Sequence, residues 1–171
     1  MSAPELLPEL SPGLPPKLYR APFAALGTRT WHDIVRLRID VFVVEQQCPY
    51  PELDGRNVEA DTVHVWAATT EGEVRGYLRL LAEPDGRARI GRVCVAPSAR
   101  RRGLAAALLA DALDHTLACR PEAAVVLAAQ SQLASWYARR DFVVDGPEFV
   151  EDGIPHLPMR LSRAVPPTTV G

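Results

Sequence analysis

Residues 93–109 read Val93-Cys94-Val95-Ala96-Pro97-Ser98-Ala99-Arg100-Arg101-Arg102-Gly103-Leu104-Ala105-Ala106-Ala107-Leu108-Leu109. The order is typical of a strand, a basic turn with one glycine, and an alanine-rich helix. The first amides of a helix have no partner within the helix and lie at its positive end, so they bind phosphate groups. Gly103 has no side chain to obstruct that approach, and three arginines add donors that suit phosphate oxygens. The stretch predicts a site for a phosphorylated ligand.

The basic turn excludes two familiar phosphate motifs. No Gly-Lys-Ser/Thr follows the glycine, as a Walker loop requires, and Gly-x-Gly-x-x-Gly is absent. The turn does fit Arg/Gln-x-x-Gly-x-Gly/Ala, with Arg100, Gly103 and Ala105 in register. This pattern resembles the acetyl-CoA signature of the GCN5-related N-acetyltransferases (GNAT). The alternative is an exposed arginine-rich turn before an ordinary helix.

Composition narrows the function further. The 171 residues suit one domain, and a net charge of −2 argues against general nucleic-acid binding. The local concentration of arginine over residues 87–102 instead suggests a small anionic ligand. Three cysteines without Cys-x-x-Cys spacing suggest a reducing compartment, and four scattered histidines suggest no metal. No apolar run reaches the ~20 residues of a membrane helix, so we expect a cytoplasmic protein that binds neither membranes nor nucleic acid.

Proline content and hydrophobic periodicity set the expected organisation. Residues 1–18 contain five prolines and predict a disordered extension, residues 19–163 one domain, and residues 164–171 a flexible tail. A helix capped by Thr30 should bury Trp31, Ile34 and Leu37, and the run 41–44 should then turn inward. Further helices are expected from residue 104 and over 132–140. The expected strands are 62–69, 74–82, 87–95, 125–129, 142–144, 149–151 and 157–161. This α/β order predicts a mixed sheet with a right-handed crossover around the basic turn.

Several longer blocks resemble the ElaA-like branch of the GNAT superfamily. They are the segments Arg38-Ile39-Asp40-Val41-Phe42-Val43-Val44-Glu45-Gln46-Gln47-Cys48-Pro49-Tyr50, Asp54-Gly55, Ile90-Gly91-Arg92-Val93, Leu127-Ala128-Ala129-Gln130-Ser131-Gln132-Leu133, Trp136-Tyr137 and Glu151-Asp152-Gly153-Ile154-Pro155-His156. The resemblance covers about residues 28–160. It implies the acyl-CoA N-acyltransferase fold, in which two parallel strands splay apart, here near 93–95 and 125–129. One departure is Asp141 where many relatives have glycine, and aspartate tolerates the left-handed backbone expected there.

The same resemblance implies how acetyl-CoA would bind. The pantetheine arm would pair with the backbone of Val93 and Val95, and the pyrophosphate would lie on the amides of Arg101 to Ala106. The expected cofactor-binding residues are Val93, Cys94, Val95, Arg100, Arg101, Arg102, Gly103, Leu104, Ala105, Ala106 and Gln130. Tyr137 matches the tyrosine that often protonates the departing thiolate in this superfamily, and a phenol is protonated at neutral pH. The alternative is a core tyrosine.

The acceptor side is less defined. Glu45 is a candidate base, although water serves that role in many enzymes of this fold. His64, Asp61, Glu151 and His156 are further candidates for the base. The expected acceptor contacts are Phe42, Asp54, His64, Arg79, Glu151 and His156. Ordinary structural or surface roles are the alternative for each of these side chains.

The chain is therefore expected to be an acetyl-CoA-dependent N-acetyltransferase that transfers the acetyl group directly to a primary amine of a small molecule or peptide. The sequence leaves open whether the protein forms a homodimer. One alternative is an acyl-homoserine-lactone-synthase-like acyltransferase, since Arg38-Ile39-Asp40-Val41-Phe42 fits its early Arg-x-x-Val-Phe pattern. The continuation Val43-Val44-Glu45-Gln46 and the short chain argue against that reading. Another alternative is a catalytically silent acyl-CoA sensor or interaction module.

Overall fold

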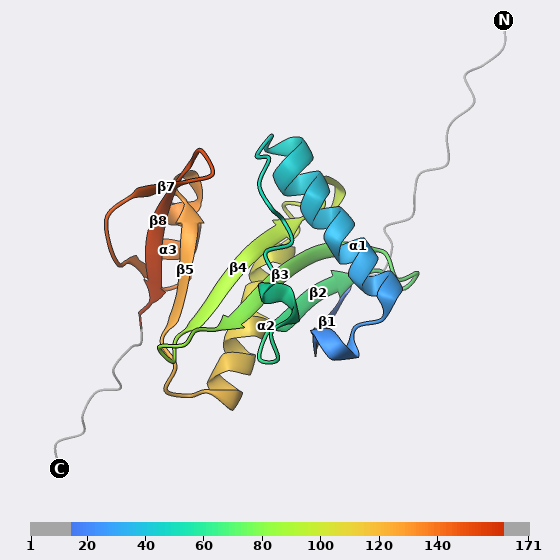
Figure 1. The fold of residues 1–171 in the computed structure, drawn as a ribbon, viewed down its shortest axis with the longest axis horizontal. Coiled ribbons are helices and arrows are strands. Elements are labelled where there is room, and N and C mark those ends of the chain that lie inside the picture. Colours follow the sequence, from blue (N-terminus) through green and yellow to red (C-terminus); the bar gives the residue numbers. More distant parts are fainter. Residues whose placement is uncertain (1–14, 163–171) are drawn as a thin grey trace, which may run out of the picture.

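A mixed eight-stranded sheet forms the centre of the computed structural model, which describes residues 15–162 (Figure 1). The strand order is β1-β2-β3-β4-β5-β8-β6, and β7 pairs with β8. The strands are β1 (Lys17–Pro22), β2 (Val63–Ala68), β3 (Val74–Ala82), β4 (Ala88–Val95), β5 (Val125–Gln130), β6 (Phe142–Val144), β7 (Phe149–Glu151) and β8 (Ile154–Leu161). The helices are α1 (Thr28–Arg38), α2 (Leu104–Cys119) and α3 (Ala134–Ala138). A π-helical segment, Ile39–Glu45, continues α1, and short 3₁₀ turns lie at Phe23–Ala25, Arg56–Val58, Pro97–Ala99 and Ser131–Leu133.

One pair of neighbouring strands is parallel, and it splays apart. β4 and β5 are in register from Ala88↔Val125 to Ile90↔Leu127, whereas β4 continues to Val95 and β5 to Gln130. Figure 1 shows the two strands diverging, with β6, β7 and β8 on the β5 side. The predicted mixed sheet with a splayed parallel pair is therefore confirmed.

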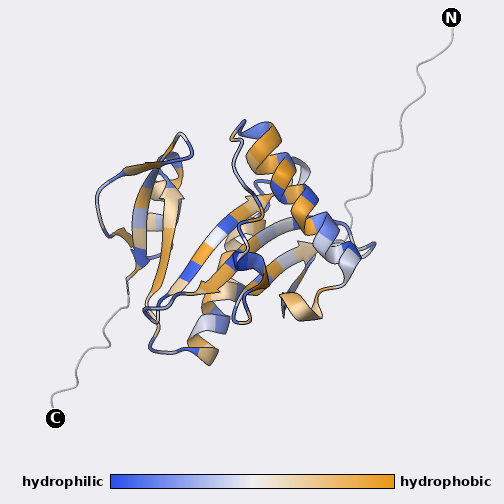
Figure 2. Ribbon diagram, in the orientation of Figure 1, coloured by the Kyte–Doolittle hydropathy of each residue, from blue (hydrophilic) through white to orange (hydrophobic). Residues whose placement is uncertain are grey.

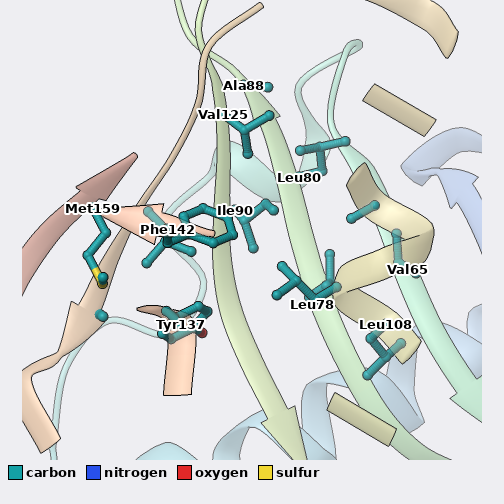
Figure 3. Packing of buried hydrophobic residues seen from close by; sticks show 14 of the residues in the cluster. Val65, Leu78, Leu80, Ala88, Ile90, Leu108, Val125, Tyr137, Phe142 and Met159 are labelled. Carbon is teal, nitrogen blue, oxygen red and sulfur yellow. The ribbon is translucent and has the colours of Figure 1, made fainter. Parts of the chain in front are cut away.

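Two apolar clusters attach helices to opposite faces of the sheet. Successive strand residues point to opposite faces, so Leu78 and Tyr77 of β3 enter different clusters. Leu78 packs with Leu108 of α2, as Figure 3 shows, and Tyr77 packs with Ile34 of α1. Figure 2 shows that α1 alternates hydrophobic and hydrophilic segments, as expected of a helix with one buried face. Burial of this stripe explains why α1 lies on the sheet.

Gly76 of β3 lets α2 approach closely. A Cβ at this position would lie 2.9 Å from Leu108 Cδ1 and 3.2 Å from Leu104 Cδ2. Because Leu104 is the first residue of α2, the same contact positions the start of the helix that follows the basic turn.

The structure corrects several expected boundaries. α1 begins at Thr28 with Gly27 as its N-cap, so the expected cap at Thr30 is wrong. The expected helix 132–140 is a 3₁₀ turn followed by the five-residue α3. Val41 is buried, but Val44 is 65% exposed, so only part of the run 41–44 turns inward. The last strand begins at Ile154, three residues before its expected start at 157.

β1 was not expected. Its first residues, Lys17 and Leu18, fall within the segment predicted to be disordered, yet they pair with Ala68 and Ala67 of β2. The rest of the expected extension, apart from residues 15 and 16, and the whole of the expected tail lie outside the described residues. Asp141 has φ +63°, which confirms that it adopts the left-handed conformation.

Candidate active site

Two cavities border β4 beyond the point where it leaves β5. The loop cavity, of about 400 Å³, is lined by Val93–Val95, four residues of the basic turn (Ala99, Arg100, Arg101 and Gly103), the start of α2, and α3. The charged cavity, of about 430 Å³, is lined by β3, β4, β5, the β7–β8 hairpin and the segment 42–56. Val93, Leu133 and Tyr137 line both. The two cavities therefore adjoin at these three residues.

The loop cavity contains a group of backbone N–H donors at the start of α2. Gly103 is the N-cap with φ +77°, and no side chain caps this end. The first bond along the helix runs from Ala107 N to Gly103 O, so the amides of Leu104, Ala105 and Ala106 have no acceptor within α2. A Cβ at Gly103 would meet nothing within 4 Å, so the surface there is open. These features fit a pyrophosphate group.

Nearly all of the predicted cofactor-binding residues meet at the loop cavity. Its lining includes Val93, Cys94, Val95, Arg100, Arg101, Gly103, Leu104, Ala105 and Ala106. Arg102 lines neither cavity, and Gln130 lines the charged one. Small side chains at Ala105 and Ala106 keep the helix end accessible.

Glu45 lies outside both linings. Arg100 donates from Nη1 and Nη2 to its two carboxylate oxygens at 2.7 and 2.6 Å, and from Nε to Val95 O at 3.0 Å. The hydrogen bonds from Arg100 hold the pKa of Glu45 below its usual range. This carboxylate therefore ties the π-helical segment to the basic turn, which is a poor setting for a base.

Tyr137 lies where the two cavities meet. Its ring packs edge-on against Trp136 at 4.8 Å and Phe142 at 5.8 Å between centroids, and Figure 3 shows Tyr137 and Phe142 together in the core. Its hydroxyl makes no hydrogen bond to another residue in the range 15–162. Burial raises the pKa of Tyr137 to about 12, so the hydroxyl keeps its proton at neutral pH. An acid here can serve a ligand that passes between the cavities.

A network of charged side chains forms one wall of the charged cavity. Arg79 donates to Asp54 at 2.8 and 2.7 Å and to Asn57 at 2.8 Å. Arg38, fully buried, also binds Asn57 and pairs with Glu52. Although burial opposes ionisation of Asp54, its hydrogen bonds and charge contact with Arg79 lower its pKa to about 2. Asp54 is therefore a fixed carboxylate and a weak base.

His64 is not brought to either cavity. It is 0% exposed, its Nε2 lies 2.9 Å from Asn57 O, and its Nδ1 lies 2.8 Å from the Tyr77 hydroxyl. A carbonyl only accepts, so Nε2 carries the proton and Nδ1 accepts from Tyr77. Burial lowers the pKa of His64 to about 4. Asp61 also lies outside both linings, 3.8 Å from Arg120.

The charged cavity gathers most of the other predicted side chains. Its lining includes Phe42, Asp54, Arg79, Gln130, Tyr137, Glu151 and His156. The His156 ring is stacked on Phe149 at 5.8 Å, and its Nδ1 lies 2.8 Å from Ile154 O. That nitrogen therefore carries the ring proton in the neutral form, which leaves the lone pair of Nε2 free.

Several lining residues were not predicted as site residues, above all Tyr50, Arg89 and Arg92. Arg89 and Arg92 belong to the noted concentration of arginine, and Tyr50 ends a matched block, so both signals were present in the sequence. Among residues 15–162, no group of three or more His, Cys, Asp or Glu side chains could hold a metal ion. The helices of that range include none long and apolar enough to cross a membrane.

Comparison with known proteins supports these observations. A family model described as an acetyltransferase (GNAT) domain matches residues 32–163. A UPF0039 protein of Mycobacterium tuberculosis is 46% identical over 141 residues, which cover 78% of this chain and 85% of the relative. Protein ElaA of Escherichia coli is 34% identical over 78% of this chain and 88% of its own length.

Solved structures agree with that result. The crystal structure of an acyl-CoA N-acyltransferase from Pseudomonas aeruginosa matches with a TM-score of 0.81 and 37% identity, over 86% of this chain and 99% of the other. The crystal structure of Escherichia coli ElaA matches with a TM-score of 0.80 and 29% identity, over the same shares.

Proposed function

Because the chain belongs to the GNAT acetyltransferase family and is closely related to its ElaA and UPF0039 members, we propose that it is an acetyl-CoA-dependent N-acetyltransferase that acts on a primary amine. The observation that carries this proposal is the meeting of the two cavities at Tyr137. One cavity offers N–H donors to a phosphorylated donor substrate, and the other leaves room for an acceptor.

The residues of the loop cavity fit acetyl-CoA. The amides from Arg101 to Ala106 would hold the pyrophosphate, with Arg101 adding positive charge. Beyond Ile90 the edge of β4 is free of β5, so the backbone of Val93 and Val95 would pair with the amide-containing pantetheine arm. The thioester would then lie near Tyr137.

The transfer itself needs few protein groups. The neutral amine nitrogen attacks the thioester carbonyl, the new C–N bond forms, and the C–S bond breaks. The electron pair of that bond goes to sulfur, which takes the proton of the Tyr137 hydroxyl, and the Tyr137 phenolate then regains a proton from water. The proton lost by the nitrogen passes to water in the charged cavity, because Glu45 and Asp54 are both held by arginines.

Calorimetry and turnover together test this function. We expect acetyl-CoA to bind to the purified protein, and at least one amine of a broad panel to cause thiol release. Mass spectrometry should find one acetyl group on that amine. Binding without turnover across the panel would favour the silent sensor, and absence of binding would overturn the proposal.

A further inference from the structure

Arg92 occupies an unusual backbone position at the splayed strands. It has φ +55° within β4, where the pairing with β3 shifts register between Tyr77 and Arg79. A bulge of this kind redirects a side chain, and a left-handed conformation at a residue other than glycine costs free energy. Such strain is retained mainly where the position is useful. The bulge follows Ile90, the last β4 residue in register with β5, and Arg92 lines the charged cavity.

The Arg92 guanidinium has hydrogen-bonding capacity that the protein does not use. Its Nε is shielded from solvent and has no hydrogen-bond acceptor, with Glu52 Oε2 at 3.4 Å. The one hydrogen bond that it makes to a described residue, from Nη2 to Asp54, is long at 3.5 Å. Both carboxylates are already held, Glu52 by Arg38 and Asp54 by Arg79. Buried donors are nearly always satisfied, so this one indicates a missing acceptor.

Arg79 also has a shielded Nε without a hydrogen-bond acceptor. It is 3% exposed and lines the same cavity. Arg89 donates from Nε to Glu83, and its two terminal nitrogens make no hydrogen bond to any residue that the structure describes. Unused donors of three arginines therefore belong to one cavity wall.

The charges of this wall do not balance. The charged network behind it contains five guanidinium groups and four carboxylates that pair with them, and of these Arg56, Arg79, Arg89, Arg92 and Asp54 line the cavity. The arginines are Arg38, Arg56, Arg79, Arg89 and Arg92, and the acids are Glu52, Asp54, Glu59 and Glu83. On the other side, Glu151 and Asp152 of the β7–β8 hairpin line the cavity and form no ion pair with a described residue. The cavity thus offers positive charge on one wall and negative charge on the other.

We propose that the acceptor amine also carries a carboxylate, and that Arg92, flanked by Arg89, binds this carboxylate. The proposal rests on the proposed function and names its substrate class, a small amino carboxylate. A surplus of one positive charge suits a singly charged group, and a guanidinium fork matches the two oxygens of a carboxylate. The Arg92 guanidinium lies over the Tyr50 ring, with Cζ 5.0 Å from the ring centroid, and this cation–π contact helps to hold the fork in the cavity. A volume of about 430 Å³ suits a small molecule.

Matched pairs of amines test the proposal. The pairs are 4-aminobutyrate with butylamine, lysine with 1,5-diaminopentane, and phenylalanine with phenethylamine; O-phosphoethanolamine is the phosphate-bearing probe. With saturating acetyl-CoA, we expect the carboxylated member of at least one pair to have a kcat/KM for thiol release at least about 10-fold higher. A hydrogen bond to a charged group contributes that much or more.

Substitution of Arg92 should remove this preference. In Arg92→Gln we expect KM for the carboxylated amine to rise about 10- to 100-fold, with KM for its uncharged partner within about 2-fold and kcat little changed. Arg89→Gln is a second, milder variant in case Arg92→Gln does not fold. Arg87→Gln is the matched control, because Arg87 pairs with Asp85 in the turn before β4 and lines neither cavity.

Three outcomes would overturn the proposal. The first is an equal kcat/KM for the two amines of every pair, and the second is a preference for O-phosphoethanolamine. The third is an equal fall of kcat in Arg92→Gln for the carboxylated amine and its uncharged partner, which would mean that Arg92 acts on the reacting atoms. Calorimetric titration of the same amines into the CoA-saturated protein measures carboxylate binding in the absence of turnover. The two proposals can therefore fail separately. If the protein is not an acetyltransferase, no amine causes thiol release, whereas the carboxylated amines can still bind more tightly than their partners.

Discussion

At the scale of single residues, Tyr137 carries the most specific chemical prediction. Tyr137 is buried at the junction of the two cavities, and its hydroxyl is protonated and makes no hydrogen bond to a described residue. Tyr137→Phe keeps the ring contacts with Trp136 and Phe142 and removes only the proton. We expect a loss of about 100-fold or more in the chemical step, because positioned acids contribute that much, with acetyl-CoA affinity nearly unchanged.

Single-turnover kinetics with an identified acceptor measures that step without interference from product release. Tyr19→Phe is the matched control, since Tyr19 stacks on Trp66 at the β1–β2 edge and lines neither cavity. An unchanged chemical step in Tyr137→Phe would make Tyr137 a structural residue and move the acid to another group.

His64 predicts how stability depends on pH. The folded protein takes up a proton on His64 only near pH 4, whereas the unfolded chain takes it up near pH 6.5. Between these values the unfolded state binds more protons, so the free energy of unfolding falls as the pH falls, by about 3 kcal/mol in all. Asp54 adds to this loss only below about pH 3.8, since its pKa is lowered in the fold.

Urea unfolding of wild type and His64→Gln between pH 7 and pH 4 measures the effect. The variant should be less stable at pH 7 but lose less stability on acidification, because glutamine takes up no proton. His32→Gln, at an exposed position, is the matched control for the loss of a histidine. Parallel curves for His64→Gln and wild type would show that other groups control the acid loss.

At the scale of elements, the basic turn and α2 form the predicted donor site. In Gly103→Asp a carboxylate would face the amides that are proposed to hold the pyrophosphate, and like charges in contact cost several kcal/mol. We expect acetyl-CoA affinity to fall at least about 100-fold with the fold retained. Single substitutions of Arg100, Arg101 or Arg102 should weaken binding less, since backbone amides carry much of the interaction.

Gly86→Asp controls for backbone strain in that experiment. Gly86 has φ +86°, close to the +77° of Gly103, and lines neither cavity. Calorimetric titration with acetyl-CoA compares the two variants. Wild-type affinity in Gly103→Asp would rule out pyrophosphate binding at this helix end.

At the scale of the whole molecule, β1 determines where the folded unit begins. A cut after residue 18 would remove Lys17 and Leu18 from their pairs with β2. We expect a chain that lacks residues 1–14 to keep its melting temperature within about 5 °C, and a chain that lacks residues 1–22 to lose more than that. The second deletion removes the Tyr19–Trp66 stack and exposes the β2 edge.

Differential scanning calorimetry of both truncated proteins and the full chain checks these expectations. A larger loss on removal of residues 1–14 would mean that this segment stabilises the domain. An unchanged melting temperature without residues 1–22 would mean that β1 contributes little to the fold.

Local sequence determined the elements whose pattern is itself local. The apolar run, the turn with Gly103 and the alanine-rich segment predicted a strand, a turn and a helix, and all three are present. That Gly103 is a left-handed N-cap came from the structure. The left-handed conformation of Asp141 was expected from the family resemblance, since many relatives have glycine there, and it is present. The edge strand β1 was missed because six residues beside a proline-rich segment form a strand only through their pairing with β2.

Tertiary structure alone decided which side chains share a site. Glu45 meets Arg100 across 55 residues, and His64 is buried between Tyr77 and Asn57, because sheet order and helix packing bring distant segments together. Arg92 joins the charged cavity through a bulge that breaks the two-residue alternation of β4. Periodicity fixes alternate faces of a strand but not what covers each face. The sequence therefore determined the family and the turn at α2, and long-range packing decided which charged groups line the cavity.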